Sequence, residues 1–372
     1  MKILKFTCLV IAAALTVALP QLVAASEATS DEAIHSRMVK RSVAFLREKG
    51  QAEDGSFSSK AGVGPTGLVV AALLDSGLKV DDPMVARALR YLEQHIQPSG
   101  GIYAEGSLHR NYSTCITMMA FARANEDGRY DKALSRAEAF VKGLQWDESE
   151  DRDPSDPYYG GAGYGSHSRP DMSNTSYLID ALHDIGRGSE DPAMQRALAF
   201  ISRCQNLDTE HNDSEFADKI GDGGFYYTVA AGGESKAGVE ANGGLRSYGS
   251  MTYAGLKSMI YAGVSQDDRR VKAAVKFLRE NYDLESNPGV GQQGLFYYYH
   301  TMAKAMAAVG APEFEDADGK KHNWRAELRK KLAKLQREDG SWVNGTTRWM
   351  EGDPNLVCAY SLLALSYCKP EK

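Results

Sequence analysis

The chain of 372 residues carries a formal net charge of −6, spread along the sequence, and its isoelectric point lies near 5.8. This acidic balance argues against a nucleic-acid partner, which requires a basic surface. After the N-terminal segment, no stretch combines the length of a membrane span with freedom from charge, so we expect no stable membrane span in the mature chain.

The N-terminal segment has the pattern of an export signal. Residues 1–5 are basic, residues 6–19 form an apolar core, and the small residues 23–25 offer a cleavage site before Ser26. We therefore expect a signal peptide over residues 1–25 and an exported mature chain, periplasmic or secreted, over residues 26–372. The mature chain exceeds the usual size of a single core, but its repeated pattern indicates one extended domain.

One motif recurs along the mature chain: Gln, three residues, Gly, one residue and an aromatic residue, at residues 51–57, 97–103 and 336–342. Looser copies keep only the Gly-aromatic end, at Gly163, at residues 223–225 and at residues 294–296. Gly permits the backbone conformation that ends a helix, the aromatic ring packs over the helix end, and the Gln amide satisfies free backbone groups. The motif predicts a structural staple in a repeat protein.

Each repeat contains two predicted helices. The first is amphipathic and the second apolar on all sides, which predicts an inner ring of buried helices inside an outer ring. The expected first helices begin near Ser42, Val85, Leu134, Met194, Arg270 and Trp324, and the second near Gly64, Tyr112, Ser173, Ser250, Tyr299 and Asn355. We expect an all-α fold, a closed (α/α)6 toroid. Gly77, Gly186, Gly263 and Gly310 are the expected stops of inner helices.

Two connections are long, residues 146–170 and residues 206–247, and loops of this length are functional lids or disordered segments. Four cysteines follow the signal segment, and their spacing matches no metal site or redox motif. Two interpretations stay open for them: buried small apolar residues, or one disulfide formed in an oxidising compartment. The four are Cys115, Cys204, Cys358 and Cys368.

The inner helices of such a ring run in parallel, so their N-termini meet at one end of a central cavity. Unpaired N–H groups and helix dipoles make this rim a candidate site for an anion or a developing charge. Asp, Asn and Ser at these positions also have a purely structural interpretation as helix caps. The residues that enter the helices are His109, Asn111, Tyr112, Asp171, Ser173, Asn174, Tyr248, Ser250, Tyr298, Tyr299, His300, Asp353 and Asn355.

The hairpins, the Gln-Gly-aromatic motifs and segments such as residues 358–365 resemble the squalene cyclase and protein prenyltransferase superfamily. Squalene-hopene-type cyclases carry an acidic motif, Pro-Asp-x-Asp-Asp-Thr-Ala, whose middle Asp protonates the polyene. The resemblance implies that residues 170–176 correspond to this motif. Residues 170–176 keep its frame, but Ser173 stands in place of the acid and Asn174 in place of its neighbour. A serine hydroxyl cannot protonate an alkene, and Asp171 alone has the pattern of a helix cap.

Protein prenyltransferases use a Tyr-His-Thr segment, whose His binds zinc, together with an Asp and a Cys at an earlier inner helix. Residues 299–301 resemble the His segment, but residues 246–253 contain neither Asp nor Cys. One ligand of three does not hold zinc, so we expect no metal and no cofactor. The Gly-Cys-Gly-Glu-Gln motif of the related thioester domains is absent from the sequence.

Two classes of function remain. The first is a binding protein that holds an apolar or isoprenoid-like ligand in its central cavity. The second is an enzyme acting on an isoprenoid or a glycan through non-standard residues, with Asp171 and His300 as catalytic candidates. The expected cavity-lining residues are Tyr112, Ser173, Asn174, Tyr253, Tyr298 and Tyr299. The missing acid and metal ligands favour the first class, and the oligomeric state stays open.

Overall fold

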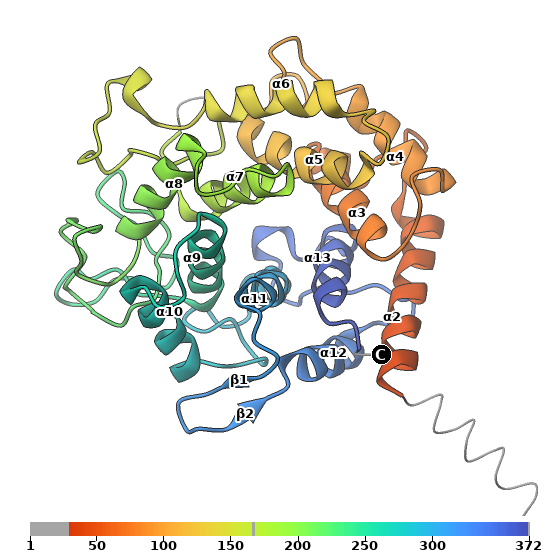
Figure 1. The fold of residues 1–372 in the computed structure, drawn as a ribbon. Helices are drawn as coiled ribbons and strands as arrows, with labels where there is room; N and C mark the ends of the chain where they lie inside the picture. Colours follow the sequence, from red (N-terminus) through yellow and green to blue (C-terminus); the bar gives the residue numbers. More distant parts are fainter. Residues whose placement is uncertain (1–29, 166–167, 371–372) are drawn as a thin grey trace, which may run out of the picture.

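The computed structural model describes residues 30–165 and 168–370, and in it the helices form two concentric rings (Figure 1). The predicted signal peptide lies outside the described residues. The inner helices are α3 (Gly64–Asp75), α5 (Arg110–Ala124), α7 (Met172–Asp184), α9 (Gly249–Tyr261), α11 (Leu295–Val309) and α13 (Pro354–Tyr367). The outer helices are α2 (Asp31–Phe45), α4 (Pro83–Glu93), α6 (Asp131–Lys142), α8 (Pro192–Arg203), α10 (Arg269–Glu280) and α12 (Trp324–Leu335).

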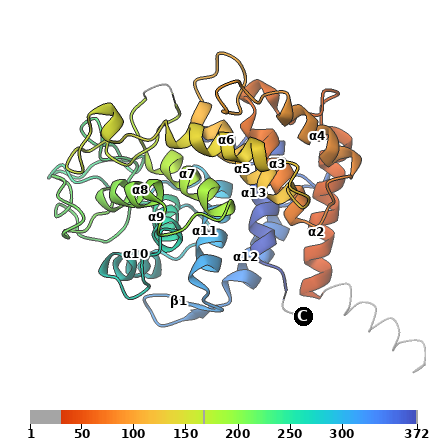
Figure 2. The same cartoon turned by 45° about the horizontal axis from the view of Figure 1, so that its top comes forward.

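The inner ring is closed. Each inner helix packs against the next, and α13 packs against α3 to complete the circle. Tilting the molecule shows the outer helices surrounding this ring (Figure 2). The remaining elements are short: the π-helical turn Leu46–Gly50, the 3-10 turns Ser59–Ala61, Glu148–Glu150 and Arg348–Met350, and an antiparallel pair β1 (Phe314–Glu315) and β2 (Lys321–His322). The predicted all-α toroid of six hairpins is confirmed.

Two predicted helix starts are wrong. Helix α2 begins at Asp31, where Ser30 caps it, and not near Ser42. Its first turns bury little apolar surface, so the periodic signal starts late. Helix α11 begins at Leu295, four residues before Tyr299, because Gly294 adopts a left-handed conformation immediately before it. Phe296 therefore belongs to the helix itself and not to a preceding turn.

The Gln of the repeated motif joins two elements. Gln51 Nε2 donates to the carbonyl of Gly55, at 3.0 Å, and to that of Met84 in the next outer helix, at 2.8 Å. Gly55 has φ of +92°, and a Cβ there would lie 2.5 Å from the Arg87 carbonyl oxygen, so only glycine fits. Gln336 repeats the arrangement with Gly340 and with Met38. The motif staples neighbouring repeats together.

The third and fourth repeats also keep this Gln, which corrects the looser copies proposed from the sequence. Gln145 Nε2 donates to the carbonyl of Gly160, and Gln205 Nε2 to that of Gly223. The glycine of the third repeat is thus Gly160 and not Gly163. Because 15 and 18 residues separate Gln from Gly in these two repeats, the fixed spacing of the motif hides them.

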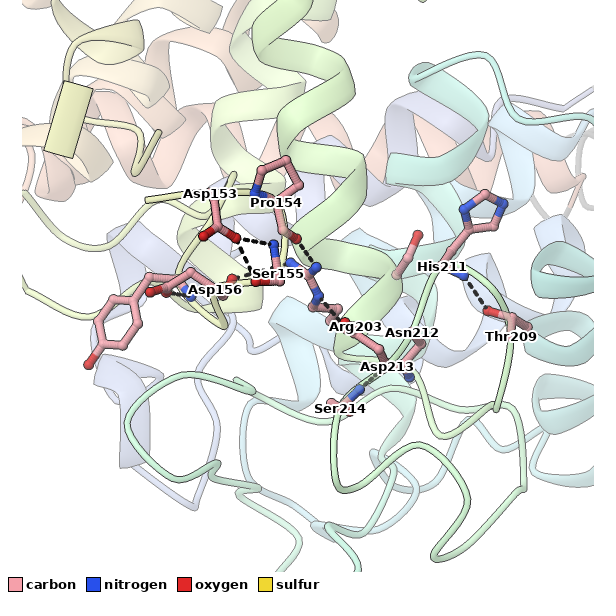
Figure 3. Close-up of polar contacts among 12 residues, drawn as sticks. Asp153, Pro154, Ser155, Asp156, Arg203, Thr209, His211, Asn212, Asp213 and Ser214 are labelled. Atoms are coloured by element: carbon pink, nitrogen blue, oxygen red, sulfur yellow. Dashed lines mark hydrogen bonds and ion pairs between the residues drawn. The ribbon is translucent and has the colours of Figure 1, made fainter. Parts of the chain in front are cut away.

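The two long connections are ordered over their described residues and meet at Arg203, the last residue of α8 (Figure 3). Its guanidinium donates to the carbonyls of Pro154 and Asp156 in the first connection. It also pairs with Asp213 in the second connection, at 3.1 Å. Only 10% of the Arg203 side chain is exposed, so one buried cation ties both connections to the ring.

We expect Arg203→Met to loosen both connections, because the apolar stem stays while three hydrogen bonds are lost. Limited proteolysis followed by mass spectrometry should show faster cleavage within residues 146–165 and 206–247. Arg129→Met is the matched control, because Arg129 pairs with Asp127 on the exposed surface and should leave the cleavage pattern unchanged. Equal cleavage of the two variants would contradict this role of Arg203.

Candidate ligand-binding cavity

A cavity of about 280 Å³ opens at the N-terminal end of the inner helices. Every inner helix except α3 contributes a large side chain to it, and α3 contributes Pro65. The two long connections, the segment before α13 and residues just before α3, α5 and α9 supply the rest of the wall. The lining residues are Ala61, Pro65, His109, Tyr112, Tyr164, Ser173, Tyr177, Tyr227, Lys236, Tyr248, Ser250, Met251, Tyr297, Trp349, Met350, Glu351, Leu356 and Tyr360.

Aromatic rings dominate this wall. Tyr112 of α5 meets Tyr177 of α7 edge to face, with ring centroids 5.1 Å apart. On the opposite side of the ring, Tyr297 of α11 meets Tyr360 of α13 in the same way, at 5.8 Å. Edge-to-face contacts of this kind hold the rings in place. The cavity is therefore a preformed aromatic chamber with hydroxyl groups at its surface.

The mouth of the cavity is apolar and exposed. Tyr164 is 40% exposed, Trp349 40% and Met350 45%, and each lines the opening. Trp349 and Met350 have φ of +56° and +64°, which is costly for two consecutive residues with side chains. Glu351 holds them there: its side chain is fully buried and accepts from Asn344 Nδ2 and from the Tyr297 backbone N–H.

Four of the six helix N-termini at the cavity, those of α7, α9, α11 and α13, are capped by side chains, which corrects the expectation of unpaired N–H groups there. Asp171 accepts from the Asn174 N–H at the start of α7, and Asp353 from the Asn355 N–H at the start of α13. Glu351 caps α11, and Asn287 Oδ1 accepts from the Ser250 N–H of α9, at 3.0 Å. Three of these caps are carboxyl groups, and they offset the positive ends of the helices.

The charge at the cavity wall is balanced. Lys236 is the one lysine or arginine among the lining residues; its amino group pairs with Glu234 and lies 4.3 Å from the centre of the Tyr227 ring. Burial raises the pKa of Asp171 and of Glu351 above that of an exposed carboxyl group. No unpaired cation among the described lining residues awaits an anionic ligand.

The residues expected from the sequence divide between the cavity and its surroundings. Tyr112 and Ser173 line the cavity. Asn174 is buried beside it, and its amide donates to Asp171 Oδ2 at 2.8 Å. Asp171 itself serves as the cap of α7.

Tyr253, Tyr298 and Tyr299 lie outside the cavity. The hydroxyls of Tyr298 and Tyr299 donate to the carbonyls of Asp283 and Leu284 in the preceding loop, each at 2.6 Å. The Tyr253 ring packs against Tyr298, with centroids 5.7 Å apart. Because α11 starts earlier than expected and each residue turns by about 100° around a helix, Tyr297 faces the cavity in place of its two neighbours.

Sequence reasoning missed most of the aromatic wall. Tyr177 and Tyr360 lie about one helical turn inside α7 and α13, deeper than the helix starts that were considered. Trp349 comes from a turn with no pattern of its own. A search for aromatic residues one turn into each inner helix would have found part of this set. The missed residues are Tyr164, Tyr177, Tyr227, Tyr297, Trp349 and Tyr360, whereas Tyr248 was among the expected rim residues and lines the cavity.

His300 lies deeper, in the wall of a small void of about 10 Å³ that we call the polar chamber; its lining residues are Ser176, Tyr177, Asp180, Lys257, Tyr297, His300 and Thr301. Asp180 Oδ2 accepts from Lys257 Nζ at 2.6 Å and lies 3.0 Å from Lys304 Nζ. These three side chains are at most 4% exposed. Burial, with Lys304 and Lys257 nearby, lowers the pKa of His300 to about 3, so its ring is neutral.

Over residues 30–165 and 168–370, no three His, Cys, Asp or Glu side chains gather closely enough to hold a metal ion. In the same ranges, none of the helices has the length and apolar character that crossing a membrane requires. The four cysteines among the described residues are buried and free.

Comparisons with known proteins agree with this architecture. Residues 60–229 match the family model of the squalene-hopene cyclase C-terminal domain. The apo structure of the type II terpene cyclase MstE from Scytonema aligns with a TM-score of 0.52 at 14% identity, over 90% of this chain and 98% of that one. The chain has a squalene cyclase-like toroid fold. The resemblance predicted from the sequence is confirmed.

The squalene cyclase-like fold also occurs in carbohydrate-active proteins. A polysaccharide lyase aligns with a TM-score of 0.53 at 11% identity, and a glycosidase with 0.54 at 13% identity; each alignment covers 91% of this chain and 97% of the other. At these identities the likeness establishes the fold alone. No curated protein sequence matches the chain.

Proposed function

We propose that this squalene cyclase-like toroid binds an uncharged, apolar or isoprenoid-like molecule in its aromatic cavity. The observation that carries the proposal is the wall itself, seven tyrosines and one tryptophan around about 280 Å³. This volume lies just below the range typical of small-molecule sites, roughly 300–1,000 Å³. It suits a short isoprenoid, or one end of a longer ligand whose remainder leaves through the mouth.

Charge argues against an anionic ligand. A diphosphate needs several unpaired basic groups or free helix N-termini. In this cavity the basic side chain of Lys236 is already paired with Glu234, and carboxyl groups cap α7, α11 and α13. An uncharged ligand avoids the repulsion from these carboxyl groups.

Farnesol, farnesyl diphosphate and a neutral oligosaccharide test the proposal in thermal-shift and tryptophan-fluorescence titrations. We expect farnesol to stabilise the protein, by about 2.7 kcal/mol at a hundredfold excess over its Kd, and the other two to have little effect. Trp349 at the mouth should report binding. Ser173→Trp, which fills the cavity, should abolish the shift, whereas Lys132→Trp on the exposed face of α6 should preserve it.

Absence of any farnesol effect, together with no co-purifying small molecule in native mass spectrometry, would overturn the proposal. Incubation with squalene, followed by product analysis, tests the second candidate function, an enzyme. Asp171 favours that candidate, because it is buried, has a raised pKa and hydrogen-bonds to Tyr227, a residue of the cavity wall. With squalene as substrate we expect no cyclised product, since Ser173 and Asn174 replace the acid pair. A cyclised product that the unmodified protein forms and the Asp171→Asn variant does not would favour the enzyme.

We also propose that the protein acts outside the cytoplasm, after cleavage before Ser26. The charged, apolar and small-residue regions of residues 1–25 support this proposal. N-terminal sequencing of the native protein should find Ser26 as the first residue. Retention of Met1 would contradict export by this route.

A further inference from the structure

We propose that the polar chamber below the cavity recognises a hydroxyl group at the leading end of the ligand. The ligand is then an uncharged alcohol of isoprenoid type and not a plain hydrocarbon. This inference rests on the proposed function, because it concerns the ligand of the same cavity.

The polar chamber and the cavity share two wall residues, Tyr177 and Tyr297. The Ser173 hydroxyl lies 3.5 Å from that of Tyr297 at this boundary. A space of about 10 Å³ has room for one water-sized group. A ligand that fills the aromatic cavity can therefore place a single hydroxyl, and nothing larger, in the polar chamber.

Two buried polar atoms of the polar chamber lack a partner among the described residues, Asp180 Oδ1 and His300 Nδ1. Their side chains are 2% and 4% exposed. The Tyr177 hydroxyl faces those of Tyr112 and Tyr360 but makes no hydrogen bond of regular geometry. Buried polar atoms are nearly always hydrogen-bonded, so this cluster indicates a site for a polar group from elsewhere.

The charges around the polar chamber select the kind of group. Asp180 Oδ1 requires a donor, which a carboxylate or a phosphate cannot supply. An ammonium group is a donor, but it would face Lys257 and Lys304, both already within 3.0 Å of Asp180 Oδ2. A hydroxyl donates to Asp180 and accepts from the Tyr177 hydroxyl or the neutral His300 ring. It satisfies the polar chamber without adding charge.

Farnesol and the hydrocarbon farnesene, titrated against the whole mature protein, test this inference. A purely apolar cavity favours the hydrocarbon, because the alcohol must shed its water. We expect the opposite order, with farnesol binding about tenfold or more tightly, because the hydrocarbon leaves the polar atoms unsatisfied. Tyr177→Phe and His300→Phe should each reduce the preference for the alcohol.

Tyr253→Phe is the matched control, because it removes an equally buried, unpartnered hydroxyl outside the cavity, and it should keep the preference. A second measurement does not depend on variants: the NMR shifts of the His300 ring nitrogens should move with farnesol and stay in place with farnesene. If the two ligands bind equally, this inference is overturned and the proposed function stands. If neither binds, this inference is overturned, and the proposed function falls with it when native mass spectrometry also finds no co-purifying molecule.

Discussion

Replacing Asp180 by Asn is expected to lower the free energy of unfolding by about 3–5 kcal/mol, the cost of leaving buried charges without their partner. Asp180 of α7 lies between Lys257 of α9 and Lys304 of α11, at 2.6 Å and 3.0 Å. Without the carboxylate, two buried ammonium groups face each other in the centre of the inner ring. Thermal and urea unfolding, monitored by far-UV circular dichroism, measure the loss.

Asp267→Asn is the matched control for this prediction. It removes one carboxylate from a lysine pair at 2.9 Å, but the two side chains are 93% and 62% exposed. Such a pair contributes less than about 1 kcal/mol. Similar losses in the two variants would show that Asp180 is not the partner that makes these buried lysines tolerable.

The second large effect that we expect is a loss of folding stability at low pH, and it depends on His300. The buried His300 ring has a pKa of about 3, whereas the same side chain in the unfolded chain should have the ordinary histidine pKa of 6.5. The groups around it are Lys304, Lys257, Asp180 and Arg123. Below about pH 6.5 the unfolded state therefore binds a proton at this histidine, whereas the folded state does not. The stabilisation is complete above pH 6.5 and is lost as the pH falls towards 3, by roughly 3–5 kcal/mol in total.

His300→Gln removes this titration, so its stability should fall less steeply between pH 6.5 and pH 3 than that of the unmodified protein. The comparison between the two proteins matters, because the carboxylates of the ring titrate in the same range in both. Asp171, whose pKa burial raises above that of an exposed carboxyl group, is one of them. Parallel stability curves for the two proteins would contradict a neutral His300 in the folded state.

The toroid could be predicted because its signals are local and repeated. Helix-ending glycines, apolar inner helices and the Gln-Gly-aromatic motif each lie within a few residues, and six copies reinforce one another. The dependence on local signals also explains which features of the fold the sequence did not predict. Gln145 and Gly160 perform the motif's function across a long insertion, and the first turns of α2 carry no apolar stripe that would reveal them.

Which residues face the cavity depends on where each inner helix begins, because the start of the helix sets the direction of every side chain along it. A run of three tyrosines, residues 297–299, shows no preference for one of them, yet Tyr297 alone faces the cavity. The start of α11 decides this, and Gly294 and Glu351 set that start from outside the helix. The anion site expected at the rim failed for a related reason, because the caps Asn287 and Glu351 come from distant loops.

By itself, then, the sequence determined the repeat, the two rings of helices and the absence of the cyclase acid pair, because each of these depends on residues close together in the chain. Only the tertiary structure decided which tyrosines form the cavity and which charges meet beneath it. Asp180 and Lys257 are 77 residues apart. They meet because closing the ring brings α7 and α9 into contact, and burial then makes their pairing obligatory.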